Sequence, residues 1–508
     1  MDGAELSRRS LLRAGAGALL ASALHPARSL AAASRPTTGT IDLGELRRGT
    51  VREVGLPPGT GVVGLQWDRR GPEHPAVWLR ARLRDGRWGP WAAAGAQDHG
   101  PEGAPRGAQG EPLWVAGARA VQLRSEARLP EARLRLVAAG LAPGEAGLAA
   151  RDASELPLAQ PVLDAGPGQP PVIERSVWAR GTQLPRVAPS YGSVELAFVH
   201  HTDNPNGYDA AEVPAMLRAI YVFHRDVNGW NDIGYNFVID LFGRIFEARA
   251  GGIDQPVVGA HAGGYNIYST GIAVLGTFSG TPVSPAAKRS LQRLLAWKLS
   301  LHGTPTNGRV IVRVDPAGAV YSRFPANSRV SLPRIAGHRD ADSTDCPGQV
   351  LYDELPSVRR SAARLAGTPA VATLELIPAP ATTPATPAAP SEAPPPQTPA
   401  AAVSPPQLVA TLRALATGAP LAGLPVVLQA RTLARRGELV TETVLGEGIT
   451  DAEGRWSLAA SFAVGAQRTL AVRVVQPGSA AAGACVSPSV AVAPVPALSV
   501  PAASAPSF

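Results

Sequence analysis

The chain has 508 residues, too many for a single hydrophobic core, so several domains are expected. Its net charge of +8 comes mainly from scattered arginines, and the lack of any Lys/Arg-rich run argues against a nucleic-acid partner. The basic balance fits an anionic neighbour such as a cell-wall polymer, or a solvated surface without a specific partner. The 53 Gly and 50 Pro indicate many turns and at least one unstructured tether.

The first 33 residues resemble an export signal. Arg8 and Arg9 precede an apolar stretch at 14–24, and small residues follow at 31–33. The arginine pair resembles a twin-arginine signal, although an ordinary secretory signal with a chance arginine pair is the alternative. Either signal predicts an exported protein, extracellular or wall-associated in a bacterium. The remaining sequence lacks an uninterrupted apolar stretch of about 18 residues, so we expect no transmembrane segment in the mature chain.

Residues 38–141 predict an antiparallel β-sandwich. Val77, Leu79 and Ala81 alternate with Trp78 and Arg80, which is the period of a strand. We favour a place in the sandwich core for most of the tryptophans of this segment, and the alternative is a sugar-binding face. The tryptophans concerned are Trp67, Trp78, Trp88, Trp91 and Trp114. Residues 142–172 form a Pro/Gly-rich connector.

Residues 173–367 alternate strands with helices, which predicts an α/β domain with a mixed sheet and packed helices. A buried strand ends at His200. Ser284 is placed to cap a helix that has Pro285 at its first position and reaches His302. A second helix follows the acidic segment 209–212, and its apolar face includes His224, which we therefore expect to be structural.

The C-terminal part begins with a Pro/Ala/Thr-rich segment, 368–407, which is predicted to be an extended linker. Valine-rich strands return at 408–495 and predict an Ig-like β-sandwich. Residues 496–508 form a tail. The predicted architecture is therefore multidomain, with an α/β domain between two β-sandwiches.

Two histidines and one cysteine of the central domain form a candidate metal site. His200 ends a rigid strand, and His338 and Cys346 flank a loop long enough to bring both side chains to one ion. Three such ligands suit Zn²⁺ and leave one coordination position open, as in catalytic zinc sites. The competing interpretation is a disulfide between Cys346 and Cys485, the two cysteines of the chain. Cys485 lies beyond the Pro-rich segment, which favours the metal.

Four segments of the central domain occur in an order and spacing that resemble a known family: 198–202, 234–237, 259–266 and 337–348. They are similar to the type-2 amidase and peptidoglycan recognition protein family. Its members are zinc-dependent N-acetylmuramoyl-L-alanine amidases or their inactive wall-binding relatives. The resemblance covers about 173–365 and does not extend to the flanking domains.

The resemblance implies one zinc per chain, held by His200, His338 and Cys346. It also implies that Tyr235 and Thr344 act in catalysis, with the Tyr235 phenol stabilising the attacking water or the developing oxyanion. No glutamate is placed as a general base, so activation of water would depend on the metal.

By the same resemblance, His261 and Asn266 are candidates to contact a muramyl peptide. The implied reaction cleaves the amide between N-acetylmuramic acid and L-alanine in peptidoglycan. The alternative is a peptidoglycan-binding protein without catalysis. Because inactive relatives typically lose the cysteine ligand, the presence of Cys346 together with Tyr235 favours the enzyme.

Overall fold

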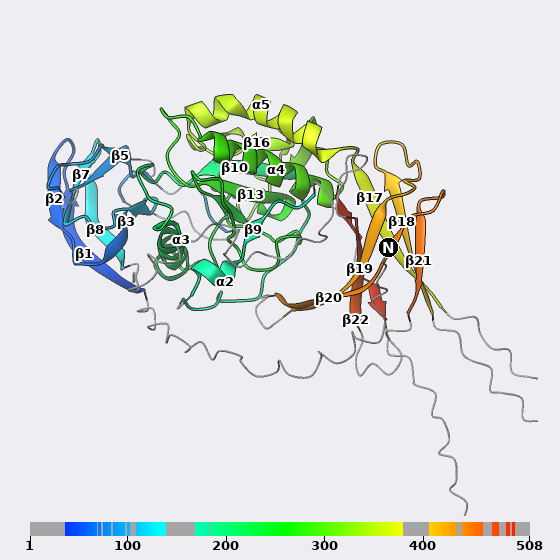
Figure 1. The fold of residues 1–508 in the computed structure, drawn as a ribbon. Coiled ribbons are helices and arrows are strands. Elements are labelled where there is room, and N and C mark those ends of the chain that lie inside the picture. Colours follow the sequence, from blue (N-terminus) through cyan, green and yellow to red (C-terminus); the bar gives the residue numbers. More distant parts are fainter. Residues whose placement is uncertain are drawn as a thin grey trace, which may run out of the picture.

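The computed structural model describes residues 36–138, 168–378 and 406–492, with gaps at 69, 73–74, 83–84, 97–98, 102–107, 181, 434–438, 461–469, 477–483 and 488–489. Three units follow one another in space: an N-terminal β domain, a central α/β domain and a C-terminal group of strands (Figure 1). The predicted export signal, most of the predicted connector and the predicted tail lie outside the described residues. Among the described residues, no helix has the length and apolar character needed to cross a membrane.

The N-terminal domain consists of two four-stranded antiparallel sheets that enclose one apolar core, as its alternating pattern predicted. One sheet has the order β1-β8-β3-β6 and the other β2-β7-β4-β5. The strands are β1 (Thr37–Leu46), β2 (Val51–Gly55), β3 (Thr60–Gln66), β4 (Val77–Ala81), β5 (Ala92–Ala93), β6 (Leu113–Trp114), β7 (Ala120–Ser125) and β8 (Leu129–Ala138).

The tryptophans of this domain divide between core and surface. Trp67 and Trp114 are buried. The other three are half-buried and interleave with arginines, as where the Arg124 guanidinium stacks 4.6 Å from the Trp78 ring. The prediction that most of the five tryptophans lie in the core was therefore wrong, since only Trp67 and Trp114 do so.

The central domain is built on a six-stranded mixed sheet of order β16-β10-β13-β11-β12-β9. Strand β10 pairs in parallel with both β13 and β16, whereas β11 and β12 form an antiparallel pair. A separate hairpin, β14-β15, shares a small apolar core with β10 and β16. The strands are β9 (Val172–Ile173), β10 (Leu196–His201), β11 (Phe237–Ile239), β12 (Ile245–Glu247), β13 (Ser269–Val274), β14 (Arg309–Arg313), β15 (Arg329–Pro333) and β16 (Ile335–Gly337).

Helices cover both faces of this sheet. Helices α4 and α5 pack on one face, and α2 and α3 pack on the other (Figure 1). As predicted, the Ser284 hydroxyl caps α4 by accepting a hydrogen bond from the Ala287 N–H (3.1 Å). The helices are α2 (Arg175–Trp178), α3 (Val213–Val222), α4 (Pro285–Leu301) and α5 (Gln349–Ala366), with short turns η2 (Phe223–Val227), η3 (Asn266–Tyr268) and η4 (His338–Asp340).

The C-terminal part is β-rich, and its two sheets share one apolar core. One sheet has the order β17-β18-β21, and the other contains β20-β19-β22-β23 with β24 beside β22. The strands are β17 (Ala370–Ile377), β18 (Gln407–Ala414), β19 (Pro425–Leu433), β20 (Leu439–Ile449), β21 (Arg455–Ala459), β22 (Leu470–Gln476), β23 (Cys485–Val486) and β24 (Val490–Val492).

Strand β17 corrects the predicted linker. It begins inside the 368–407 segment and pairs with β18 in antiparallel register, so that Ile377 lies opposite Gln407. Alternate side chains of β17 are buried, which gives the strand a core-facing side that the Pro-rich composition concealed. The Pro/Ala/Thr tract therefore connects two neighbouring strands of one sheet and does not separate two domains.

Candidate metal centre

The parallel strands β10 and β16 bring His200 and His338 to the same edge of the sheet. Val199 pairs with Gly337, and the residue that follows each of them in the chain is one of the two histidines. Their ring centroids are 4.5 Å apart. The carboxyl ends of parallel strands are the usual location of binding sites in open α/β sheets. The pairing of β10 with β16 therefore brings together two histidines that are 138 residues apart in the sequence.

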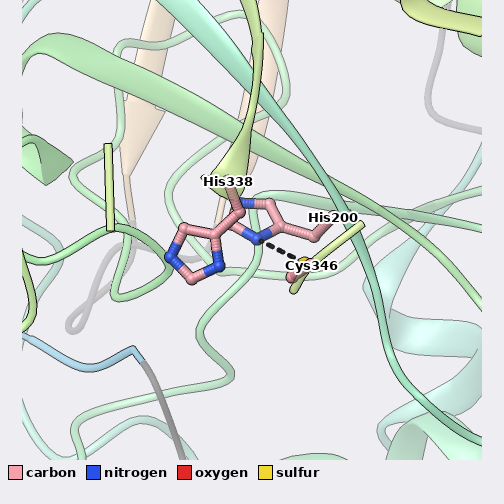
Figure 2. A group of neighbouring side chains, drawn as sticks. All are labelled: His200, His338 and Cys346. Carbon is pink, nitrogen blue, oxygen red and sulfur yellow. Dashed lines mark hydrogen bonds between the residues drawn. The ribbon is translucent and has the colours of Figure 1, made fainter. Parts of the chain in front are cut away.

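Cys346 completes the group from the loop that follows η4. Its sulfur lies 3.7 Å from His200 Nδ1 (Figure 2) and accepts a hydrogen bond from the His201 N–H at 3.4 Å. Ligand atoms of His200, His338 and Cys346 all lie within 4.8 Å of one another. Cys346 and Cys485 are not joined by a disulfide, and Cys485 belongs to the C-terminal core, so the disulfide interpretation is wrong.

The neighbours of the two imidazoles orient one nitrogen of each ring toward this group. His338 Nε2 lies 2.9 Å from Asp342 Oδ2, so its N–H donates a hydrogen bond to the carboxylate and leaves the Nδ1 lone pair for a ligand. His200 Nε2 lies 3.2 Å from His261 Nδ1. A proton on His200 Nε2 leaves Nδ1, the atom that faces Cys346, as the electron-pair donor.

Burial keeps the imidazole of His200 neutral. Desolvation lowers the pKa of His200 well below its usual value, and the neighbouring His338 and His261 lower it further. Burial lowers the pKa of His261 in the same way. Because only a neutral imidazole has a lone pair for a metal, this environment suits a ligand. Two imidazole nitrogens and one sulfur form a donor set that fits a borderline-soft divalent ion.

The two predicted catalytic residues both lie next to the ligand group. The Tyr235 ring, just before β11, has its centroid 5.5 Å from that of His200. The Thr344 hydroxyl accepts a hydrogen bond from the Cys346 N–H (2.9 Å) and so holds the loop that carries the sulfur.

The two predicted substrate residues are fully buried behind the ligands. His261 lies against His200, as described above. The Asn266 side chain accepts hydrogen bonds from the His261 and Ala262 N–H groups at 2.8 and 3.1 Å, and so fixes the loop that carries His261. In this structure neither residue faces solvent. Sequence reasoning missed Asp342, although a carboxylate four residues after a candidate ligand could have been recognised as its hydrogen-bond partner.

The structure also places a residue of the N-terminal domain beside this centre. The His99 ring centroid lies 5.4 Å from that of Tyr235 and 6.0 Å from that of His338. His99 Nδ1 is 3.3 Å from Glu111 Oε1. Sequence reasoning missed His99 because no local motif connects it with residues a hundred or more positions away.

The fold and this donor set define an α/β domain with a metal-ligand group at the carboxyl edge of its parallel strands. Residues 190–349 match the family profile described as N-acetylmuramoyl-L-alanine amidase. The central domain belongs to the family of these amidases and the peptidoglycan recognition proteins. Residues 23–150 match a second profile, described as Rv3811 N-terminal galactose-binding domain-like.

Individual relatives are similar to the central domain. Peptidoglycan-recognition protein SC1a/b of Drosophila simulans is 28% identical over 185 residues, which cover 36% of this chain and 83% of the relative. The N-acetylmuramoyl-L-alanine amidase of Homo sapiens is 30% identical over 192 residues, 37% of this chain and 28% of the relative. Among solved structures, Drosophila PGRP-LB aligns with a TM-score of 0.28 and 27% identity, covering 37% of this chain and 92% of PGRP-LB.

Proposed function

We propose that this protein is an exported, zinc-dependent N-acetylmuramoyl-L-alanine amidase that hydrolyses the amide between N-acetylmuramic acid and L-alanine in peptidoglycan. The observation that carries the proposal is the convergence of His200, His338 and Cys346 beside Tyr235 in a domain of the amidase family. Retention of the sulfur ligand and the tyrosine supports a hydrolase over a protein that only binds the wall.

In this proposal His200 Nδ1, His338 Nδ1 and the Cys346 thiolate hold one Zn²⁺ per chain. When bound, zinc polarises an amide carbonyl and lowers the pKa of a water molecule. Asp342 and His261 fix the orientation and protonation of the two ligand rings through the hydrogen bonds at their Nε2 atoms.

Tyr235 is assigned to transition-state stabilisation. Its ring lies beside His200, where a phenol hydrogen can be donated to the oxygen that gains negative charge as the amide is attacked. Thr344 is assigned a positioning role through its bond to the Cys346 N–H. For His261 and Asn266, the contacts favour support of the ligand shell over the substrate contact implied by the sequence resemblance.

The proposed substrate places the protein outside the cytoplasm. An export signal of twin-arginine type in residues 1–33 and a net charge of +8 agree with action at an anionic wall, and the partners are peptidoglycan and, through charge, anionic wall polymers.

A wall-digestion assay on the full chain tests the proposal. We expect new amino groups from released stem peptides, glycan strands that stay uncut, about one zinc per chain, and loss of both zinc and activity in Cys346→Ser. Binding of peptidoglycan without new amino groups would instead identify a non-catalytic wall-binding protein.

A further inference from the structure

The candidate metal centre is closed to solvent. His338, His200, Tyr235 and Cys346 are exposed by 0, 1, 3 and 6%. A muramyl peptide must bring its amide to this centre, so an entirely buried set of reacting groups has no path for it. Some part of the structure has to move before the proposed reaction can occur.

The part that covers the centre is a short segment of the N-terminal domain. His99 is only 2% exposed, and its ring lies 6.4 Å from that of His200. The carbonyl of the next residue, Gly100, accepts a hydrogen bond from Asn266 Nδ2 at 3.1 Å. A Cβ on Gly100 would lie 2.6 Å from the Tyr321 hydroxyl, so a side chain here would press against the buried Tyr321 of the central domain.

The residues around this segment belong to the N-terminal β domain. The Ala96–Gly110 and Gln66–Gln109 bridges lie within this domain on either side of His99 along the chain. The Glu111 carboxylate, on the returning side, holds the His99 ring at 3.3 Å. His99 therefore contacts both its own domain, through Glu111, and the metal centre.

The N-terminal domain is itself docked on the central domain close by. Trp114 N–H donates to Asn204 Oδ1 at 2.6 Å, and Val62 joins the apolar core that contains Phe223. Strand β3 lies so close to this core that a Cβ on Gly64 would be 2.3 Å from the Phe223 ring. The N-terminal domain therefore contacts the central domain in two places: through His99 and Gly100 at the metal centre, and through β3 and Trp114 beside it.

We infer that the N-terminal domain is an intramolecular cap, which keeps the amidase latent by holding His99 and Gly100 over the metal centre. The inference rests on the proposed function. Opening separates His99 and Gly100 from the centre and exposes Tyr235 and the ligands to a muramyl peptide. The capped protein has low turnover because only its open fraction binds substrate.

Two substitutions should open the cap without touching the proposed catalytic groups. Gly100→Val introduces a clash with Tyr321, and Gly64→Leu introduces one with Phe223 at the docking surface. Gly55→Val is the matched control, because Gly55 lies on the exposed edge of the same domain and a Cβ there meets nothing within 4 Å. Zinc content is measured first in each full-length protein. Absence of zinc from the wild type would overturn the proposed function itself, before the cap is tested.

With zinc present, the readouts are the rate of zinc extraction by a coloured chelator and kcat/KM on a soluble muramyl peptide. We expect each opening variant to raise both by at least about tenfold, with Gly55→Val unchanged. Extraction that is equally fast in all four proteins would overturn the cap.

The variant His99→Ala distinguishes a capping role of His99 from a catalytic role. The cap predicts unchanged or higher kcat/KM in His99→Ala, because the side chain that fills the centre is shortened. A large fall in kcat with zinc retained would assign His99 to the chemistry and overturn its assignment as a cap.

Discussion

Arg473 on β22 and Asp254 in a loop of the central domain form a buried ion pair across 219 residues of sequence. Arg473 also donates a hydrogen bond to Gln429 Oε1 at 2.9 Å. Val475 and Ala484 belong to the same core as α4, so the C-terminal strands pack directly on the central domain around this pair. The ion pair therefore joins the amidase domain to the part of the chain that follows the Pro-rich tract.

Removal of one partner of this pair should be costly. Asp254→Ala leaves the Arg473 charge buried without its carboxylate, which typically destabilises a protein by about 3–5 kcal/mol. Thermal unfolding of the full chain is the measurement, with Glu45→Ala as control. Glu45 pairs with Arg128 at the surface, and its removal should leave the midpoint nearly unchanged. If both substitutions shift the unfolding midpoint by the same amount, the buried pair contributes no more to stability than a surface pair.

Asp342→Asn tests the support of the metal ligand His338. The amide cannot stabilise the His338 Nε2 proton as the carboxylate does, so we expect about 10- to 100-fold weaker zinc affinity. Competition with a chelator of known affinity measures it. Asp345→Asn, an exposed neighbour in the same loop, should retain wild-type affinity. If the two variants bind zinc equally well, Asp342 does not position the ligand.

Tyr235→Phe removes the phenol hydroxyl while the ring stays. If the hydroxyl stabilises the developing oxyanion, kcat should fall by about 100- to 1,000-fold, with zinc content unchanged. Tyr208→Phe is the control, because that hydroxyl bonds the Leu275 carbonyl away from the centre. Steady-state kinetics on a muramyl peptide measure kcat for both variants. A wild-type kcat in Tyr235→Phe would show that the Tyr235 hydroxyl does not act in catalysis.

His224 should make stability depend on pH. Burial lowers its pKa well below the usual value, assisted by the nearby His99 and Arg249. Below pH 6.5 the unfolded chain takes up a proton on His224 that the folded protein does not bind, so stability falls as pH decreases toward the folded-state pKa. This single residue contributes a slope of up to about 1.4 kcal/mol per pH unit.

His224→Asn should remove that contribution. Its side-chain oxygen can still accept the Gly234 N–H, which bonds His224 Nδ1 at 3.2 Å. Denaturant unfolding of both proteins between pH 5 and 8 gives the comparison. The stability of the wild type relative to the variant should decline only below pH 6.5, and a constant difference would contradict the assignment.

Much of the central domain could be predicted from local signals. The Ser284-Pro285 cap placed α4 correctly, and the apolar run before His200 placed β10. The hairpin of β14 and β15 was missed, although alternating valines at 310, 312 and 314 carried a strand signal. Strand β17 was missed for a different reason, because the proline content of the following tract dominated the interpretation of the whole segment.

For the site, a resemblance in sequence located the ligand group, and strand register explains why it forms. The neighbours of the ligands were harder to predict. Asn266 was expected to face substrate but supports the loop of His261, because a buried amide can satisfy two backbone donors. The approach of His99 depends on how two domains dock, and no periodicity or motif within either domain encodes that contact.

The register of β17 against β18 changes what the Pro-rich tract can do. Since the tract leaves Ile377 and returns to Gln407 directly opposite, its contour length does not govern the reach of the C-terminal strands from the amidase. A protease that cut the chain between these two strands would yield fragments that stay associated through the shared sheet. Shortening or extending the tract should likewise leave the spacing between catalytic and C-terminal parts unaltered.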